Sequence, residues 1–529
     1  MTTPDAEFSL ELSRRTLLAA AGLGGAAVAA SLIGSGAAEG AAAAPPSPHP
    51  VTVPPVTGLH LQFGADASSE LVVSWHALQP VRNPRVVLGH LDGRLEQTVD
   101  AKEQCYTDAK SGQVVYAYHA KLDRLQADFT YLYGAMHDGA EAEFATFRTS
   151  PRGRAPFTFT SFGDQGTPTL GRKYVPPAGV SIPNPPYVND NLGSPAAADT
   201  TLGVERLQPL FHLFNGDLSY ANLAEDRVRT WWDFWENNSR SARKRPWMPS
   251  PGNHENELGN GPIGYRAYQT YFSLPEGQTD VTRGLWYAFT AGSVRVVSIA
   301  NDDICYQDSG NSYVRGYSSG AQKAWLEKEL AAARGDHDVD WIVVCMHQVA
   351  ISTADMANGA DLGIREEWVP LLEKYGVDLV VCGHEHHYER SHPIRGWESN
   401  ATRTPVPAAT ATDVIDTSRG TVHMVIGGGG TSAPTNQRFF NPPQCRVITA
   451  VGEPDPATGK RPSVYVREQA PWSAVRNAAH SYGFAAFTVD PGSERGGITT
   501  IEVTYYDVVG PDGQLAPFES FTLRRPRRD

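Results

Sequence analysis

The chain contains the stretch Asp378-Leu-Val-Val-Cys-Gly-His384-Glu-His386, in which a short apolar run ends at a glycine and two histidines follow. An apolar run of this length before a glycine is typical of a buried strand that ends at a loop. In an open α/β sheet, reactive groups gather beyond the carboxyl ends of the strands. The stretch therefore predicts an α/β domain with these histidines at one edge of a sheet.

Four other blocks are built in a similar way, and nearly every one has a glycine beside a side chain that can bind a metal. These side chains are Asp164, Asp217 with Tyr220, Asn253 with His254, and His347. Taken singly, each block is an ordinary turn or a buried core histidine. Together they offer hard oxygens and imidazoles, which suit Fe, Mn and Zn. Five such blocks in one chain predict a metal site.

The blocks resemble, in order and content, those of the purple acid phosphatases within the wider calcineurin-like metallophosphoesterases. The family pattern is D-x-G, G-D-x-x-Y, G-N-H-[DE], V-x-x-H and G-H-x-H, and the chain matches it at Gly163 to Gly166, Gly216 to Tyr220, Gly252 to Glu255, Val344 to His347 and Gly383 to His386. Most metallophosphoesterases have a histidine where this chain has Gly166. This chain instead has a tyrosine, Tyr220, three residues after Asp217. The exchange of an imidazole ligand for a phenolate distinguishes the purple enzymes from their relatives.

The resemblance implies two sets of ligands. Fe(III) is expected on Asp164, Tyr220 and His386, because a phenolate favours a trivalent ion. A divalent ion is expected on Asn253, His347 and His384, with Asp217 bridging the two metals. Zn, Mn and Fe(II) all fit the divalent position. Two cations about 3.5–4 Å apart clamp a phosphoryl oxygen and activate a water as a hydroxide nucleophile.

His254 and Glu255 are the expected catalytic residues beside these ligands. The imidazole of His254 is expected to hydrogen-bond the phosphate, together with Asn253, or to give a proton to the leaving group. Glu255 is expected to orient that imidazole, as carboxylates do for catalytic histidines. A glutamate at the start of a helix explains Glu255 equally well.

The chain departs from the family after His347. Plant and animal enzymes carry another substrate-facing histidine about ten residues later, whereas Gln348 to Asn358 contains none. Its absence favours hydrolysis of diesters, or of a broad range of esters, at a less acidic optimum. His387 is a weaker candidate for the pocket, because a ring next to a ligand usually points away.

Residues 1–44 have the features of a bacterial twin-arginine export signal. Arg14-Arg15 precedes an Ala- and Gly-rich apolar stretch, and small residues follow up to Pro45. The stretch is weakly hydrophobic for a membrane span. We expect export of the folded, metal-loaded protein, which is then secreted, periplasmic or attached to the cell envelope. No transmembrane segment is expected in the mature protein.

The rest of the chain exceeds one ordinary domain, so two domains are expected. Residues 54–151 alternate short strands with turns, and Trp75 after Val-Val-Ser indicates a fibronectin type III or immunoglobulin-like β-sandwich. Residues 155–523 alternate strands with helices such as 321–334 and 365–375, and the resemblance implies an α/β metallophosphoesterase fold, a β-sandwich flanked by helices. The long segments 176–203 and 391–420 follow ligand blocks and are expected to decide substrate choice.

Charge and cysteine content limit the partners and the redox chemistry. A net charge of −13 argues against nucleic acid as a partner. Small phosphate esters remain suitable substrates, because metals dominate the local field. The basic residues Arg524 to Arg528 are expected to form a solvated tail. Five cysteines exclude complete pairing within one chain. Cys345 and Cys382 are expected in the core, and Cys305 with Cys445 is the candidate disulfide.

Three functions are consistent with these observations. The first is an exported acid phosphatase-like phosphomonoesterase with Fe(III) and a divalent metal, with phosphodiesterase activity as an addition. The second keeps the two-metal site but holds Mn or Zn in both positions and hydrolyses diesters. The third is a non-catalytic exported binding module, against which the intact set of seven ligands argues.

Overall fold

The computed structural model describes residues 53–169, 171–173, 178–181, 187–189, 191–275, 279–310 and 312–528. The expected export signal at residues 1–44 lies outside these residues. Among the described helices, none is long and apolar enough to cross a membrane.

The first eight strands form two four-stranded antiparallel sheets with the orders β1-β2-β6-β5 and β4-β3-β7-β8. Their bounds are Thr57–Phe63 (β1), Leu71–Ala77 (β2), Arg85–Gly89 (β3), Leu95–Asp100 (β4), Lys102–Thr107 (β5), Val114–Leu122 (β6), Thr130–Met136 (β7) and Glu143–Arg148 (β8). Trp75 of β2 and Tyr133 of β7 are fully buried. The expected all-β N-terminal domain is therefore confirmed.

This domain packs on helices α3 (Arg227–Ala242) and α4 (Arg266–Tyr271). The imidazole of His60 in β1 stacks on Trp235 of α3, with ring centroids 3.8 Å apart. The Nε2 atom of His60 lies 2.8 Å from the main-chain oxygen of Tyr271. The N-terminal domain thus supports the helices that flank the second part of the chain.

The second part of the chain contains two seven-stranded mixed sheets. The first has the order β13-β12-β9-β27-β28-β29-β22 and the second β14-β15-β16-β18-β23-β19-β26. The first comprises Phe157–Phe162 (β9), Phe211–Asn215 (β12), Trp247–Ser250 (β13), Val414–Asp416 (β22), Gly483–Asp490 (β27), Ile498–Gly510 (β28) and Gln514–Pro526 (β29). The second comprises Tyr287–Ala291 (β14), Val294–Ser298 (β15), Trp341–Cys345 (β16), Leu379–Cys382 (β18), Tyr388–Ser391 (β19), Val422–Ile426 (β23) and Ser473–Arg476 (β26).

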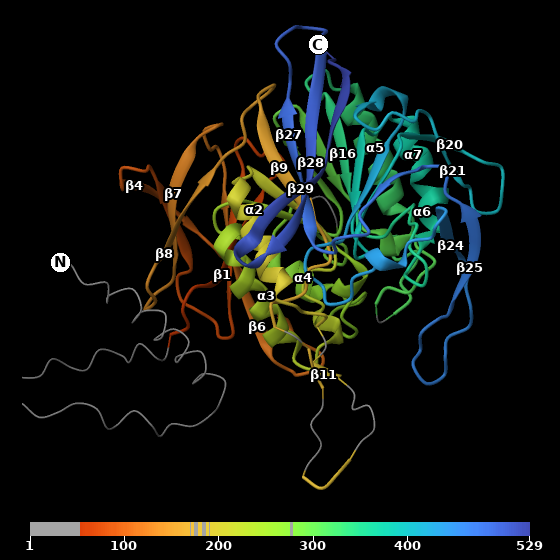
Figure 1. Cartoon of the computed structure of the whole chain (residues 1–529). Helices are drawn as coiled ribbons and strands as arrows, with labels where there is room; N and C mark the ends of the chain where they lie inside the picture. The colour runs from red at the N-terminus through yellow and green to blue at the C-terminus, as the bar shows by residue number, and fades with distance from the viewer. Residues whose placement is uncertain are drawn as a thin grey trace, which may run out of the picture. The chain divides into compact units, whose positions relative to one another are not determined.

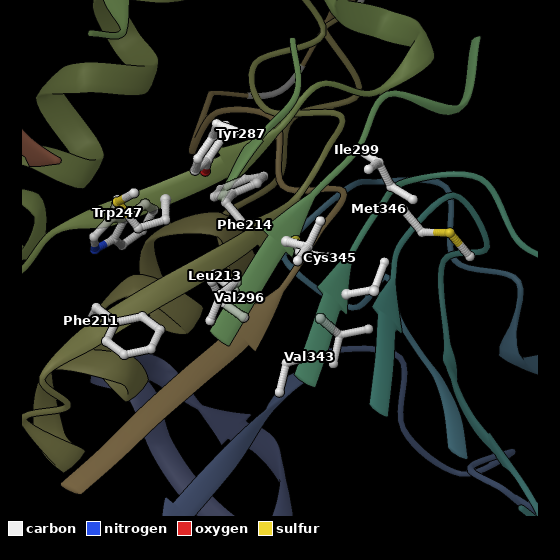
Figure 2. Packing of buried hydrophobic residues seen from close by; sticks show 14 of the residues in the cluster. Phe211, Leu213, Phe214, Trp247, Tyr287, Val296, Ile299, Val343, Cys345 and Met346 are labelled. Carbon is white, nitrogen blue, oxygen red and sulfur yellow. The ribbon is translucent and has the colours of Figure 1, made fainter. Parts of the chain in front are cut away.

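The two sheets pack face to face around an apolar core (Figure 2), in which side chains of β12 such as Phe211 lie near those of β15 and β16. The rings of Phe211 and Phe289 are 5.4 Å apart. The flanking helices include Ala196–Leu207 (α2), Ala321–Gly335 (α5), Leu362–Glu367 (α6) and Val369–Lys374 (α7). The remaining strands are Arg172–Lys173 (β10), Tyr187–Asn189 (β11), Ala360–Asp361 (β17), Ile394–Trp397 (β20), Pro405–Pro407 (β21), Gln444–Val451 (β24) and Ser463–Gln469 (β25). The expected β-sandwich flanked by helices is confirmed.

The C-terminal strands complete the first sheet. Strand β9 pairs with β27, and β27, β28 and β29 follow as antiparallel neighbours. Figure 1 shows these three strands in blue beside β9. The expectation of a solvated tail at Arg524 to Arg528 is wrong, because β29 extends to Pro526 and Arg525 binds a buried carboxylate.

That carboxylate is Asp378, which is fully buried just before β18. Its oxygens lie 2.5 and 2.6 Å from Nη1 of Arg525 and accept a bond of 2.9 Å from Arg334. The main-chain N–H of Ile342 in β16 donates a further bond of 2.9 Å. Burial raises the pKa of Asp378, but Arg525 and Arg334 lower it more, so the net pKa lies below its usual value. Asp378 therefore ties the second sheet to the last strand.

Replacing Asp378 by asparagine is expected to lower the free energy of unfolding by about 3–5 kcal/mol, because Arg525 and Arg334 lose their buried counter-charge. Chemical denaturation measures this difference. The control is Glu327→Gln, which removes an exposed ion pair of 2.7 Å with Lys374. It should cost less than about 1 kcal/mol. Equal losses in the two variants would contradict the role given to Asp378.

The segment 391–420 was expected near the metal site, and the structure places it elsewhere. Ile394 forms a bridge with Thr421, which directly precedes β23. Strands β18 and β23 are parallel, so this segment lies at their amino ends, whereas His384 follows the carboxyl end of β18. The expectation failed because the intervening strand β19 is antiparallel to β23 and carries the chain back across the sheet. The other segment, 176–203, is only partly within the described residues.

Candidate metal centre

The predicted ligands come together at the carboxyl ends of parallel strands from both sheets. In the first sheet β9, β12 and β13 are parallel, and they lead to Asp164, Asp217 and Asn253. In the second sheet β16 and β18 are parallel, and they lead to His347 and to His384 with His386. Ligands far apart in the sequence thus meet at one edge, as the pattern of the blocks predicts.

The glycines before the ligands provide space as well as a turn. A Cβ on Gly383 would lie 2.2 Å from Oδ2 of Asp164, and one on Gly252 would lie 2.3 Å from Oδ1 of Asp217. A Cβ on Gly216 would lie 2.6 Å from Nδ1 of His347. Of these three, only Gly216 has a positive φ, at 79°. At Gly252 and Gly383 a glycine is therefore explained by the close approach of another predicted ligand, and not by a left-handed turn.

Four of the predicted ligands adopt a left-handed backbone conformation. The φ angles of Asp164, Asp217, Tyr220 and His384 are 61°, 53°, 56° and 70°. Residues other than glycine rarely adopt such angles, and the strain is usually found at functional sites.

One group of side chains consists of Asp164, Tyr220 and His386. The Tyr220 hydroxyl lies 3.2 Å from Oδ1 of Asp164 and 3.1 Å from Nε2 of His386. That nitrogen is 3.3 Å from the same Asp164 oxygen. These are the three residues expected around Fe(III).

The second group is centred on Nε2 of His347. This atom lies 3.0 Å from Oδ1 of Asn253, 3.1 Å from Oδ2 of Asp217 and 3.2 Å from Nδ1 of His384. The donor atoms of Asp217, His347 and His384 all lie within 4.8 Å of one another, which suits a shared metal ion. These are the residues expected around the divalent ion, with Asp217 among them.

The outer nitrogen of each ligand histidine faces an oxygen atom. For His347 this is the main-chain oxygen of Asn215 at 2.8 Å, and for His386 it is that of Ala433 at 2.6 Å. For His384 it is Oε1 of Gln307 at 2.8 Å. An N–H bound to each of these oxygens leaves the inner nitrogen with a lone pair directed into the site, which is how metal-binding histidines are normally held.

The electrostatics of the site also fit a metal. Burial lowers the pKa of His347, but the carboxylates of Asp217 and Asp164 raise it to about 10, so the surroundings strongly favour a positive charge. Burial, Asp164 and Asp217 raise the pKa of Tyr220 well above its usual value. A phenolate at Tyr220 therefore requires a nearby cation, which a trivalent ion supplies.

His254 lies at the open side of this group. Its side chain is 19% exposed against 2% for Asp217, so solvent reaches the imidazole. Nδ1 of His254 is 2.8 Å from Oδ1 of Asn222, and its ring packs on Tyr220 with centroids 4.5 Å apart. Burial lowers the pKa of His254 to about 4 although Asp217 raises it.

Glu255 does not have the expected role. Its carboxylate accepts main-chain hydrogen bonds of 2.9 Å from Asp217, 2.8 Å from Leu218 and 2.7 Å from Gly252. Glu255 therefore clamps the two loops that carry Asp217 and Asn253, and it is Asn222 that contacts the His254 ring. The prediction that Glu255 orients His254 is wrong.

His387 and the cysteines lie outside the ligand set. His387 is fully buried, with Nδ1 2.8 Å from the Thr435 hydroxyl and Nε2 3.1 Å from Glu389, so it does not enter the pocket. Cys345 and Cys382 are buried, as expected. All five cysteines are free, so the candidate bridge between Cys305 and Cys445 is not formed.

Two residues at the site were missed by the sequence analysis, namely Asn222 and Gln307. Asn222 is two residues after Tyr220 in a short 3₁₀ turn, and that closeness was the only signal. Gln307 lies in a loop with no motif, and nothing in the sequence distinguishes it from the other glutamines.

Two family models match the chain. A model described as calcineurin-like phosphoesterase matches residues 189–388, and one described as the N-terminal domain of purple acid phosphatase matches residues 56–152. Together they cover most of the two parts described above.

Similar proteins occur in bacteria and plants. An uncharacterised protein of Mycobacterium tuberculosis is 60% identical over 475 residues, covering 90% of this chain and 88% of that protein. Phosphoenolpyruvate phosphatase of Allium cepa is 27% identical, covering 72% of this chain and 71% of that protein. Fe(3+)-Zn(2+) purple acid phosphatase 12 of Arabidopsis thaliana is 27% identical, covering 60% of each.

Among solved structures, the purple acid phosphatase PPD1 from yellow lupin seeds has the same fold. Its TM-score is 0.63 at 20% identity, and the match covers 90% of this chain and 75% of that one.

Proposed function

The chain belongs to the purple acid phosphatase family of the calcineurin-like phosphoesterases, which are metal-dependent hydrolases of phosphoric esters, and on this premise we propose that it hydrolyses small phosphate esters with Fe(III) and a divalent metal ion. Asp164, Tyr220 and His386 would hold Fe(III). Asn253, His347 and His384 would hold the divalent ion, and Asp217 would be shared between the two.

The observation that carries this proposal is the convergence of acceptor atoms on Nε2 of His347. Asn253, Asp217 and His384 each direct an oxygen or a nitrogen at it from 3.0–3.2 Å. One imidazole nitrogen donates a single hydrogen bond, so protons alone do not satisfy this arrangement. Tyr220, rather than a histidine, at the neighbouring position supports a trivalent ion there.

The two metals, when bound, supply a Lewis acid for the phosphoryl oxygens and lower the pKa of a water to near neutrality. The residues of this protein would hold the metals and fix the orientation of the side chains that bind them. Glu255 fixes the backbone that presents Asp217, and Asn215 and Ala433 fix the rings of His347 and His386.

His254 is the proposed substrate contact, together with Asn253. With Nδ1 held by Asn222, the ring turns its Nε2 towards the site, 4.0 Å from Oδ2 of Asp217. A bound phosphate dianion favours the protonated imidazole, which then donates from Nδ1 to Asn222 and from Nε2 to a phosphate oxygen. The same proton is available to the leaving group.

We propose hydrolysis of both monoesters and diesters, at a less acidic optimum than in the plant enzymes. The stretch from Gln348 to Asn358 contains no histidine, and the side-chain amide of its last residue, Asn358, donates a 2.8 Å bond to the main-chain oxygen of His384. An amide does not supply a proton to a leaving group. Phosphodiester substrates with good leaving groups need that proton least.

We propose that residues 1–44 direct export by the twin-arginine route. We also propose that the N-terminal domain, residues 54–151, is of the fibronectin type III type, and that residues 155–523 form the catalytic domain. The Arg14-Arg15 pair with the Ala/Gly-rich stretch supports the first. The two four-stranded antiparallel sheets support the second.

The test of the proposed function is metal analysis of the purified protein, combined with rates on p-nitrophenyl phosphate and its bis ester across pH. We expect one iron and one further metal per chain and turnover of both substrates. Two Mn or two Zn ions with a strong diester preference would favour the second function described above. If neither substrate is hydrolysed with any added metal, only the third function, a non-catalytic binding module, would remain.

Replacing Tyr220 by phenylalanine is expected to abolish the visible absorption band that a phenolate on Fe(III) produces. The variant keeps the ring and removes the oxygen that lies 3.2 Å from Asp164. An absorption spectrum measures the band. The matched control is Tyr268→Phe, which removes another fully buried hydroxyl, one that donates to the main-chain oxygen of Pro249 at 3.2 Å. A band that survives in the Tyr220 variant would disprove the assignment.

A further inference from the structure

His384 differs from the other two ligand histidines in what holds its outer nitrogen. His347 and His386 face main-chain oxygens, which no substitution of a side chain removes. Nε2 of His384 instead faces Oε1 of the Gln307 side chain at 2.8 Å. The orientation of this ligand therefore depends on one replaceable residue.

Gln307 belongs to a closed ring of three hydrogen bonds. Its Nε2 donates to Oδ1 of Asn358 at 3.4 Å. Nδ2 of Asn358 donates to the main-chain oxygen of His384 at 2.8 Å. The ring closes through the 2.8 Å contact between Gln307 and the His384 imidazole. Both the backbone and the ring of His384 are thus held by the same pair of amides.

The direction of every bond in this ring is set by one atom, the main-chain oxygen of His384, which only accepts. Asn358 must present its NH₂ group to that oxygen, so its Oδ1 faces Gln307. Gln307 must then present its own NH₂ group to Asn358, so its Oε1 faces the imidazole. The imidazole therefore carries its proton on Nε2, and Nδ1 keeps a lone pair. That Nδ1 atom is the one that lies 3.2 Å from Nε2 of His347.

The loop that carries Gln307 is itself anchored. The main-chain N–H groups of Tyr306 and Gln307 donate to Asp361 at 2.9 and 3.0 Å. The Asp361 carboxylate also caps helix α6 through Gly363 at 2.8 Å. Gln307 therefore acts from a fixed backbone, as a residue that orients a ligand must.

We propose that Gln307, supported by Asn358, is a positioning residue of the divalent metal site, which fixes His384 in the Nε2–H tautomer with Nδ1 free to bind the metal. The inference rests on the proposed function, because it concerns the divalent position of that site. It also gives a role to Asn358, whose amide joins Gln307 to the main chain of His384.

The test compares Gln307→Met with the wild-type protein and with Gln307→Glu. Methionine keeps the length of the side chain but removes the oxygen acceptor, whereas glutamate keeps an acceptor. We expect the methionine variant to bind the divalent metal about 10- to 100-fold more weakly in chelator competition. Iron and its absorption band should remain, because His384 is not an Fe(III) ligand. The glutamate variant should restore the affinity.

Gln444→Met is the matched control, because Gln444 is a half-buried glutamine in β24 outside the site. It should bind both metals as the wild type does, and thermal unfolding of both methionine variants checks that they are folded. Equal affinity for the divalent ion in Gln307→Met and Gln444→Met would overturn the inference, as would equal loss of iron and of the divalent metal in Gln307→Met.

A second measurement separates this inference from the proposed function. Nitrogen-15 chemical shifts of histidine-labelled, metal-free protein report the tautomer of His384, with assignment by a His384→Gln variant. We expect the Nε2–H form in the wild type and its loss in Gln307→Met. A wild-type Nδ1–H form would overturn the inference. A wild-type protein that binds no metal but shows the expected tautomer would instead disprove the proposed function, and with it the metal-binding role of His384, while the orientation of His384 by Gln307 would stand.

Discussion

An Asp217→Asn variant is expected to lose both metal ions and at least about 1,000-fold in kcat. Oδ2 of Asp217 lies 3.1 Å from Nε2 of His347, and Oδ1 accepts the main-chain N–H of His254 at 2.8 Å. Asparagine has the same shape but no charge, and an NH₂ group facing His347 blocks the metal. The loss extends to iron because Asp217 is the proposed bridge. Metal analysis and steady-state rates measure the two effects.

The control is Asp108→Asn, which changes another fully buried aspartate, one that pairs with Arg227 away from the site. It should keep two metals per folded chain and the wild-type kcat, whatever it costs in stability. Retention of iron in Asp217→Asn, with loss of the divalent ion only, would show that Asp217 does not bridge.

A Gly383→Ala variant is expected to lose metal binding and at least about 100-fold in kcat, since displacement of a catalytic group by about 1 Å has an effect of this size. Its Cβ would lie 2.2 Å from Oδ2 of Asp164 and 2.7 Å from the main-chain oxygen of Asn215, which holds the ring of His347. That oxygen belongs to the last residue of β12, which pairs with β13 in the sheet. The single methyl group is therefore expected to displace side chains of both proposed metal positions.

Gly335→Ala is the matched control, because a Cβ on Gly335 meets nothing within 4 Å and its φ is not positive. Metal content and kcat should equal those of the wild type. Full metal content in Gly383→Ala would show that the site tolerates the methyl group and that the space at Gly383 is not required.

The grouping of the candidate ligands was predictable because each of these side chains follows its strand closely in the sequence. An apolar strand is followed closely by the candidate side chain, in most blocks after a glycine, and parallel strands bring their carboxyl ends together. Strands such as β16 and β18 therefore placed His347 and His384 without any knowledge of the loops. The alternation of strands and helices predicted an α/β domain, and the arrangement of two packed sheets was implied by the family resemblance.

The rest of the site depends on contacts that local sequence does not encode. Gln307 meets His384 across 77 positions of the chain, in a loop without regular structure. Glu255 was given the wrong partner because its carboxylate binds the main chain of Asp217, Leu218 and Gly252 rather than the ring of its sequence neighbour His254. Arg525 looks like part of a charged tail until its partner Asp378, at a distance of 147 positions, is known.

The pairing of β9 with β27 has a consequence for biosynthesis. Thr158 and Thr488 contact each other across the two strands, 330 positions apart, and Asp164 directly follows β9. At about 5–20 residues per second, the ribosome needs roughly 20–70 s between these two strands. During that interval β9 has no neighbour on this side, so the sheet that carries Asp164 is incomplete. We therefore expect a metal to be inserted only when translation of the polypeptide is nearly finished.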